Sequence, residues 1–310
     1  MRNLVINYIF EEAKKNPNII LMTADLGYSV MEKFMQELPK QFINTGIAEQ
    51  NMIGVAAGLA LSGKKVFVYT IAPFATMRCF EQIRVDVCYQ NLDVTIIGVG
   101  GGLAYGTLGT THYALEDLAT MRSLPNMKVM CPADPNEAAL VVKKAMKIEG
   151  PSYIRLNRGG EKNVIDDIDY SGIEIVSPIK IIENKGSVVI FSCGNILSEA
   201  YKAANNLVKN NKHVSLFSLP FLKPVDKEAV VNILKDYKAI FTVEEHNIIG
   251  GLGSIIAEMI AEENLNVKLV RLGIEDKYFD FIGKQDYMRD QAGISAQKIE
   301  QKIINSFYER

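Results

Sequence analysis

The sequence has no excess of either charge, no long hydrophobic run and little cysteine. Its 310 residues include 34 basic and 36 acidic side chains, a balance that excludes electrostatic nucleic-acid binders, which carry a basic excess. The most apolar stretch, around residues 94–102, is far too short to span a bilayer. The first 15 residues have no apolar signal-peptide core and turn acidic within a few positions. We therefore expect neither a nucleic-acid partner nor a membrane.

Only four residues are cysteine, and their positions give no metal-type spacing. They lie within apolar or helical patterns, which indicates buried free thiols. These residues are Cys79, Cys88, Cys131 and Cys193. Free thiols persist in a reducing compartment, so we expect a cytoplasmic protein with no metal ligands of its own.

Short apolar runs alternate with amphipathic stretches in the first half of the chain. Buried strands are expected at residues 19–23, 66–70, 94–99, 128–131 and 153–156. Helices are expected between them at residues 29–38, 48–61, 73–89, 113–123 and 135–147. This alternation predicts an α/β fold, in which a mostly parallel sheet has helices on both faces.

A polar, acidic and turn-rich stretch at residues 161–186 interrupts this rhythm and is expected to be a linker. A second alternating block follows it. Strands are expected there at 188–192, 214–218, 239–243 and 267–272, and helices at 197–209, 227–234, 253–261 and 296–306. The chain is therefore predicted to hold two α/β domains, at residues 1–160 and 187–310.

Ligands of parallel α/β sheets bind where strands end and helices begin, so polar and aromatic residues at those junctions are the candidates for chemistry. They are Asp25, Ser29, Glu49, Phe74, Phe80, His112, Arg155 and Arg158. Glu49 opens a helix of small apolar residues, whose burial favours the neutral acid while the helix start favours the anion. It could instead be a capping glutamate of the first turn.

The three histidines differ in their surroundings. His112 ends a loop rich in glycine and threonine, where backbone amides can approach a ligand; it could shuttle protons or donate to an oxyanion, or merely cap the next helix. His213 opens a strand and is expected to be structural. His246 follows a strand and stays open between the two roles. The nearby glycine-rich run at residues 250–253 could bind a phosphate or serve tight packing.

Several segments resemble the C-terminal half of transketolases. FINTGIAEQNMIGVAAGLALSG is similar to the segment that carries the glutamate of thiamine-diphosphate enzymes. GTTHYALEDLATMRSLPNMKVMCPADPNEA, PSYIRLNRGG and VEEHNIIGGLGS are similar to later segments of the family. The resemblance extends to deoxyxylulose-phosphate synthase and to the beta subunit of 2-oxoacid dehydrogenases.

The resemblance implies roles for individual residues. Glu49 would hydrogen-bond the pyrimidine ring of thiamine diphosphate, which promotes the tautomer that deprotonates the thiazolium carbon. Phe74 and Phe80 match aromatic positions that wall the pyrimidine, and Met77 replaces an aromatic residue between them. Asp25 matches a residue near the cofactor.

Substrate contacts are implied in the same way. Ser29 and Arg158 match contacts to a sugar phosphate, and His112 matches the histidine beside the reacting carbonyl. Two positions depart from the family pattern, because Gly100 and Leu108 replace a histidine and an aspartate that contact sugar hydroxyls. We therefore expect an unusual, deoxygenated or modified sugar.

The GDG…N motif, through which thiamine enzymes hold Mg²⁺ (or Ca²⁺) and the diphosphate, is missing, and the sequence contains no Gly-Asp-Gly. The chain begins where the family's pyrimidine-binding domain begins. We expect a split transketolase whose N-terminal partner subunit carries the motif, in a heterotetramer or around a homodimer of this chain.

The expected reaction is transfer of a two-carbon ketol unit from a ketose phosphate to an aldehyde. A decarboxylating enzyme like deoxyxylulose-phosphate synthase or a dehydrogenase beta subunit is the alternative, and pyruvate as donor would distinguish it. A regulatory paralogue without chemistry is a third hypothesis, against which the presence of Glu49, Phe74 and His112 argues.

Overall fold

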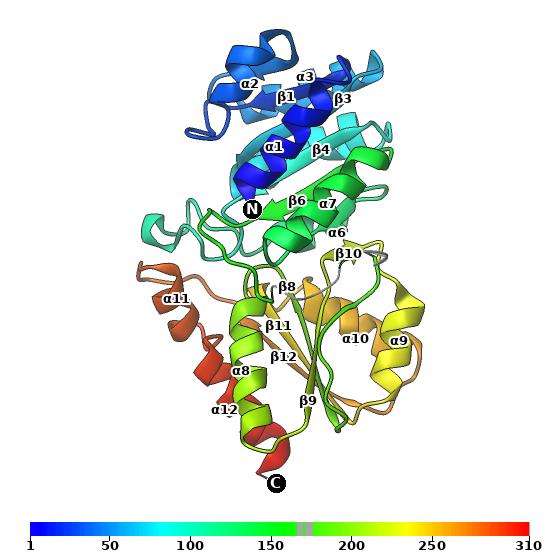
Figure 1. Cartoon of the computed structure of the whole chain (residues 1–310), viewed down its shortest axis with the longest axis vertical. Helices are drawn as coiled ribbons and strands as arrows, with labels where there is room; N and C mark the ends of the chain where they lie inside the picture. The colour runs from blue at the N-terminus through cyan, green and yellow to red at the C-terminus, as the bar shows by residue number, and fades with distance from the viewer. Residues whose placement is uncertain (166–169, 171–175, 310) are drawn as a thin grey trace.

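The computed structural model describes residues 1–165, 170 and 176–309, in which two sheets lie one above the other along the long axis (Figure 1). The first sheet has seven strands in the order β10-β5-β6-β4-β3-β1-β2, all parallel except β10. Their bounds are β1 Ile19–Thr23, β2 Phe42–Asn44, β3 Lys65–Ile71, β4 Val94–Val99, β5 Lys128–Met130, β6 Ser152–Leu156 and β10 Phe221–Lys223.

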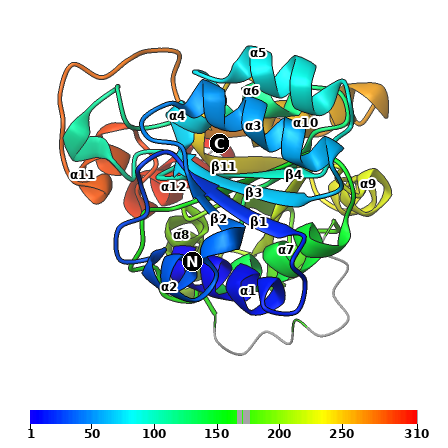
Figure 2. The same ribbon diagram turned by 90° about the horizontal axis from the view of Figure 1, so that it is seen from above.

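Helices cover both faces of this sheet, as Figure 2 shows from above. One face carries α1 (Arg2–Ala13) and α7 (Pro135–Lys147), while α3 (Glu49–Leu61) and α6 (Asp117–Arg122) lie over the other. Successive strand residues point to opposite faces. In β1, for example, Leu21 packs into the α1–α7 core, whereas its neighbour Met22 packs into the α3 core. The central strands β1 and β4 are largely apolar because both of their faces are buried.

The segment expected to form one helix at residues 73–89 is broken. It consists of α4 (Ala72–Thr76), a short α5 (Phe80–Gln82) and a π-helical turn at Ile83–Cys88. The Thr76 hydroxyl donates back to the Ala72 carbonyl at 2.8 Å, a bond that competes with helix continuation. The break leaves Met77 and Arg78 exposed at the carboxyl edge of the sheet.

The second sheet has five strands in the order β12-β11-β8-β9-β7. Their bounds are β7 Ile179–Ile182, β8 Val188–Cys193, β9 Val214–Ser218, β11 Ala239–Asn247 and β12 Lys268–Ile274. The helices of this second half are α8 Leu197–Lys209, α9 Lys227–Lys235, α10 Leu252–Glu262, α11 Gln285–Gln291 and α12 Ala296–Ile303. The first half also contains the small helices α2 Glu32–Glu37, η1 Pro39–Gln41 and η3 Gly106–Leu108. Helices α8 and α12 pack on one face of this sheet, and α9 and α10 on the other.

Two strands depart from the expected division into blocks. Strand β7 lies inside the stretch expected to be a linker and pairs antiparallel with β9. Strand β10 comes from the second block but pairs antiparallel with β5 in the first sheet. Residues 166–169 and 171–175 of the expected linker lie outside the described residues. The predicted α/β class with mostly parallel sheets is confirmed.

The structure also bears on the cysteines and on membrane-spanning helices. All four cysteines are free and buried, as predicted. None of the helices in the described ranges has the length and the apolar run that a membrane crossing requires.

Candidate active site

Glu49 begins helix α3 at the carboxyl edge of the first sheet, and its side chain is only 3% exposed. Its Oε2 atom accepts a hydrogen bond from Nη1 of Arg78 at 2.8 Å. In the part of the chain that the structure describes, no backbone amide donates to this carboxyl, so the capping alternative finds no support there. Among the described residues, the cation that pairs with this buried acid is Arg78.

Arg78 joins this acid to an aromatic ring. Its guanidinium lies over the face of Phe74, 4.1 Å from the ring centroid, in a cation–π contact. Gln50, the neighbour of Glu49, donates to the Arg78 carbonyl at 3.0 Å and fixes the backbone there. Arg78 was not among the residues predicted from sequence, although a cation inside an otherwise apolar segment just after Phe74 was an available signal.

Ring contacts continue from Phe74 along the same edge. The rings of Phe74 and His112 meet edge to face with centroids 5.4 Å apart, and His112 meets Tyr105 at 6.4 Å. The guanidinium of Arg158 then lies 5.3 Å from the Tyr105 centroid. An unbroken series of contacts therefore connects Glu49 to Arg158.

The topology explains why residues so distant in sequence meet. Strands β3, β4 and β6 are adjacent and parallel, and the segments after them carry Phe74, His112 and Arg158 respectively. Their carboxyl ends therefore open at one edge of the sheet, which is where α/β folds bind ligands. Tyr105 was missed because only the fold of its glycine-rich loop places its ring between His112 and Arg158.

The ring of Tyr105 fills the space next to Gly100 in which a side chain at that position would lie. Gly100 has φ +79°, and a Cβ atom built there would lie 1.9 Å from Cε2 of Tyr105. Leu108, the other departure from the family pattern, ends a short turn and is half exposed. The Tyr105 ring thus takes the space that a side chain at position 100 would need.

Asp25 and Ser29 lie on the loop after β1, where both have positive φ, of 55° and 64°. Asn44, at the end of β2, accepts from the Asp25 amide at 3.0 Å and donates to its carboxylate at 3.1 Å. The Ser29 amide donates to Glu32 at 2.7 Å. Within the described residues, no hydrogen bond or ring contact connects Asp25 or Ser29 with the series from Glu49 to Arg158.

Met77 and Phe80 also lie outside this series. Met77 is 39% exposed at the break between α4 and α5. Phe80 is partly buried and packs against the hydrophobic core beneath the segment. Phe74 is thus the candidate aromatic residue that the described contacts join to Glu49, through Arg78.

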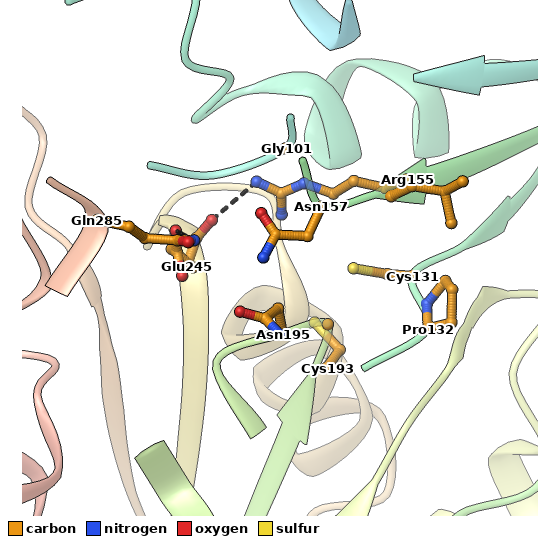
Figure 3. A pocket seen from close by; sticks show the side chains of 11 residues that line it. Gly101, Cys131, Pro132, Arg155, Asn157, Cys193, Asn195, Glu245 and Gln285 are labelled. Atoms are coloured by element: carbon orange, nitrogen blue, oxygen red, sulfur yellow. Dashed lines mark hydrogen bonds between the residues drawn. The ribbon is translucent and has the colours of Figure 1, made fainter. Parts of the chain in front are cut away.

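A buried polar cluster that includes Arg155 and Glu245 connects the two sheets (Figure 3). Arg155, which is 5% exposed, pairs with Asp117 at 3.2 Å and donates to the carbonyl of Glu245 at 2.8 Å. The Glu245 carboxylate accepts from the Leu103 amide and from Arg289, both at 2.6 Å. These bonds fasten the loop that carries Tyr105 and His112 to the second sheet. The adjoining cavity, of about 20 Å³, has room for about one water molecule.

The remaining histidines have structural partners. His246 is fully buried; its Nδ1 lies 2.6 Å from the Asn247 carbonyl, and its Nε2 accepts from the Ala119 amide at 3.3 Å. Burial lowers the pKa of His246 to about 4, so the ring is neutral near pH 7. His213 is exposed and lies 2.8 Å from the side-chain oxygen of Asn184.

The glycine-rich run before α10 serves packing. The amides of Leu252 and Gly253 each donate to the Glu244 carboxylate at 2.8 Å, which occupies this helix start. A Cβ atom at Gly251 would lie 2.0 Å from Oε2 of Glu244. The phosphate-binding alternative for this run is therefore not supported. Across the described residues, no cluster of acidic, histidine or cysteine side chains could hold a metal ion.

Comparisons with known proteins give a consistent family. The family model for the transketolase pyrimidine-binding domain matches residues 1–161, and the model for the transketolase C-terminal domain matches residues 178–299. The chain is 35% identical to one of the subunits of the apulose-4-phosphate transketolase of Actinobacillus succinogenes, over 96% of each chain. It is 33% identical to 6-deoxy-6-sulfo-D-fructose transketolase subunit SqwH of a Clostridium species, over 96% of this chain and 92% of that protein.

Solved structures give the same result. A split gene transketolase described as an inactive beta4 tetramer superposes with a TM-score of 0.86 at 37% identity, over 98% of this chain and 96% of that one. Transketolase from Campylobacter jejuni superposes with a TM-score of 0.82 at 20% identity, which shows the shared fold; this chain covers 46% of its length.

Proposed function

We propose, from the premise that this chain belongs to the transketolase family, that Glu49 and Phe74 bind the pyrimidine ring of thiamine diphosphate. The chain is a subunit of the split form of the family, which acts with a partner subunit. The observation that carries the proposal is the contact series from Glu49 to Arg158, which aligns an acid, an aromatic face, a histidine and an arginine along one sheet edge.

The residues present fit the pyrimidine ring. The carboxyl of Glu49 offers a hydrogen bond and the Phe74 ring a flat apolar face, and a pyrimidine ring bound between them would displace the planar Arg78 guanidinium that now contacts both. When bound, thiamine diphosphate supplies a thiazolium carbon that attacks a carbonyl. Glu49 would hold the proton at the pyrimidine nitrogen, and Phe74 would orient the ring. Asp25, Met77 and Phe80 would border the cofactor at the same sheet edge.

His112 and Arg158 would receive the substrate. His112 lies with Nδ1 2.8 Å from the Thr111 hydroxyl, and its Nε2, which has no hydrogen-bond partner among the described residues, would donate to the oxygen of the reacting carbonyl. Arg158, with Ser29, would hold the anionic end of the sugar through charge-assisted hydrogen bonds. The reaction is transfer of a two-carbon ketol unit from a ketose phosphate to an aldehyde. Related subunits named for apulose 4-phosphate and for a sulfosugar support an unusual sugar here.

The metal and the diphosphate would be held by an N-terminal partner subunit. This sequence contains no Gly-Asp-Gly, and we assign Mg²⁺ (or Ca²⁺) to the GDG…N motif of that partner. Helix α3, whose opposite side buries Glu49, offers it an outward face on which Gly54, Val55, Gly58 and Leu61 are exposed. The beta4 tetramer of the related split protein supports self-association of this chain within a heterotetramer. The buried free thiols support a cytoplasmic location.

The test is ketol transfer by the complex reconstituted with the N-terminal-type subunit. With xylulose 5-phosphate as donor and ribose 5-phosphate as acceptor, we expect Glu49→Ala to lower the rate by about 100-fold or more. Glu81→Ala, which removes an exposed carboxyl from the adjacent helix α5, is the matched control and should keep the rate. Full turnover by Glu49→Ala would refute the assignment. Consumption of pyruvate in place of the ketose would favour the decarboxylating alternative.

A further inference from the structure

The geometry points to Tyr105 as the residue that sets the sugar preference of the site. Its half-buried ring lies between the two proposed substrate contacts, with its centroid 6.4 Å from that of His112 and 5.3 Å from the Arg158 guanidinium. The inference rests on the proposed function, because it assumes that the reacting carbonyl faces His112 and the anionic end faces Arg158. The middle carbons of the sugar then pass Tyr105.

Tyr105 also excludes any side chain at position 100. A Cβ atom on Gly100 would meet two atoms of the Tyr105 ring, at 1.9 and 2.2 Å, and φ at Gly100 is +79°, a conformation that favours glycine. The place from which another side chain could reach a sugar hydroxyl is therefore filled by aromatic carbon. Gly100 and Tyr105 act as one unit, in which the glycine makes room for the ring.

The loop holds the ring in place. The Gly106 amide donates to the Leu103 carbonyl at 2.8 Å, and the Leu103 amide donates to Glu245 at 2.6 Å. A Cβ atom at Gly106 would lie 2.7 Å from the carbonyl oxygen of Gly283, so the loop is packed against the second half of the chain. Because both sides of Tyr105 are fastened, its ring cannot easily withdraw from a substrate that fits poorly.

A fixed aromatic surface selects for the chemistry of the carbon that meets it. A hydroxyl pressed against the ring loses its hydrogen bonds to water and gains none in return, whereas a C–H or a methyl group packs favourably. We infer that the preferred donor is an anionic ketose that keeps its C3 hydroxyl, which becomes the carbonyl of the released product, and that is deoxygenated or alkyl-branched at C4.

The experiment compares two donors in the reconstituted complex: xylulose 5-phosphate and its 4-deoxy analogue. We expect wild type to favour the deoxy donor by at least about 10-fold in kcat/KM, a margin typical of a single unpaired polar group. Tyr105→Ala should shift the ratio by at least about 10-fold towards the hydroxylated donor. Tyr105→Phe should keep the wild-type ratio, because the ring and not the hydroxyl carries the effect. Tyr89→Ala, which removes an exposed ring elsewhere, is the control.

A ratio of two donors is independent of the fraction of folded enzyme, so partial misfolding of a variant does not mimic the effect. Tyr105→Leu, which keeps an apolar side chain, should give an intermediate ratio. A wild-type ratio in Tyr105→Ala, equal rates on both donors in wild type, or a Tyr105→Phe variant that behaves like Tyr105→Ala would each overturn the inference. Absence of ketol transfer from either donor by wild type would instead refute the proposed function.

Discussion

Replacing Arg78 by methionine should expose how strongly the Glu49 carboxylate depends on its cation. The variant removes a charge-assisted hydrogen bond of 2.8 Å to an acid that is 3% exposed. Hydrogen bonds to charged groups contribute about 1.5–3 kcal/mol, and the 45% exposure of Arg78 places this one at the lower end. Loss of the cation–π contact with Phe74 adds about 0.5 kcal/mol. We expect the free energy of unfolding to fall by roughly 2 kcal/mol.

A double-mutant cycle isolates the pair. Glu49→Gln, Arg78→Met and the double variant are unfolded in urea and followed by circular dichroism, and the coupling energy should be about 1–2 kcal/mol. Arg84→Met is the control, because Arg84 and its partner Glu81 are both exposed and 3.6 Å apart, and it should change stability by less than about 0.5 kcal/mol. A coupling energy below about 0.3 kcal/mol would show that Arg78 does not hold Glu49, and the geometry of the site would then be wrong.

Three further predictions concern pH, assembly and packing. The pKa of His246 falls from 6.5 in the unfolded chain to about 4 in the folded one, so the free energy of unfolding is highest above pH 6.5 and falls by up to about 3 kcal/mol as the pH drops through 4. His246→Gln should remove this part of the pH dependence of urea unfolding, and an unchanged dependence would contradict the prediction. A Cβ atom at Gly58 would meet open space, so Gly58→Leu should leave the isolated chain as stable as wild type or more stable. Sedimentation should nevertheless show that this variant no longer binds the N-terminal-type subunit. Binding as tight as that of wild type would exclude this face of α3 as the contact. Gly251→Ala should cost about 1–3 kcal/mol because its Cβ meets the Glu244 carboxylate at 2.0 Å, and wild-type thermal stability would refute the packing role.

Most strands buried on both faces were predictable from sequence, since they form largely apolar runs. Strands β1 and β4, for example, have the predicted bounds, and every one of their residues is buried. Strands β7 and β10 were not predicted, because they are short, lie at sheet edges and pair antiparallel with partners distant in sequence. The break after α4 involves the bond from the Thr76 side-chain hydroxyl to the Ala72 carbonyl, which an amphipathic pattern does not encode.

The residues of the site also fall into those that the sequence predicts and those that it does not. Glu49, Phe74, His112 and Arg158 lie in motifs directly after strands, so the sequence and the topology together were sufficient to place them at one edge. Arg78 and Tyr105 contact these residues only because of how a helix breaks and a glycine loop turns. Similarly, the role of His246 depends on an amide of a distant helix, which local sequence does not indicate.

The central claim is that this chain holds only the pyrimidine-binding half of a thiamine diphosphate site. The most direct measurement is calorimetric titration of thiamine diphosphate, with Mg²⁺ present, into this chain, into the N-terminal-type subunit and into their equimolar mixture. We predict binding by the mixture at least about 10-fold tighter than by either chain alone, a gain of about 1.4 kcal/mol or more, and a loss of this gain with Glu49→Gln. Equally tight binding by this chain alone would contradict the account.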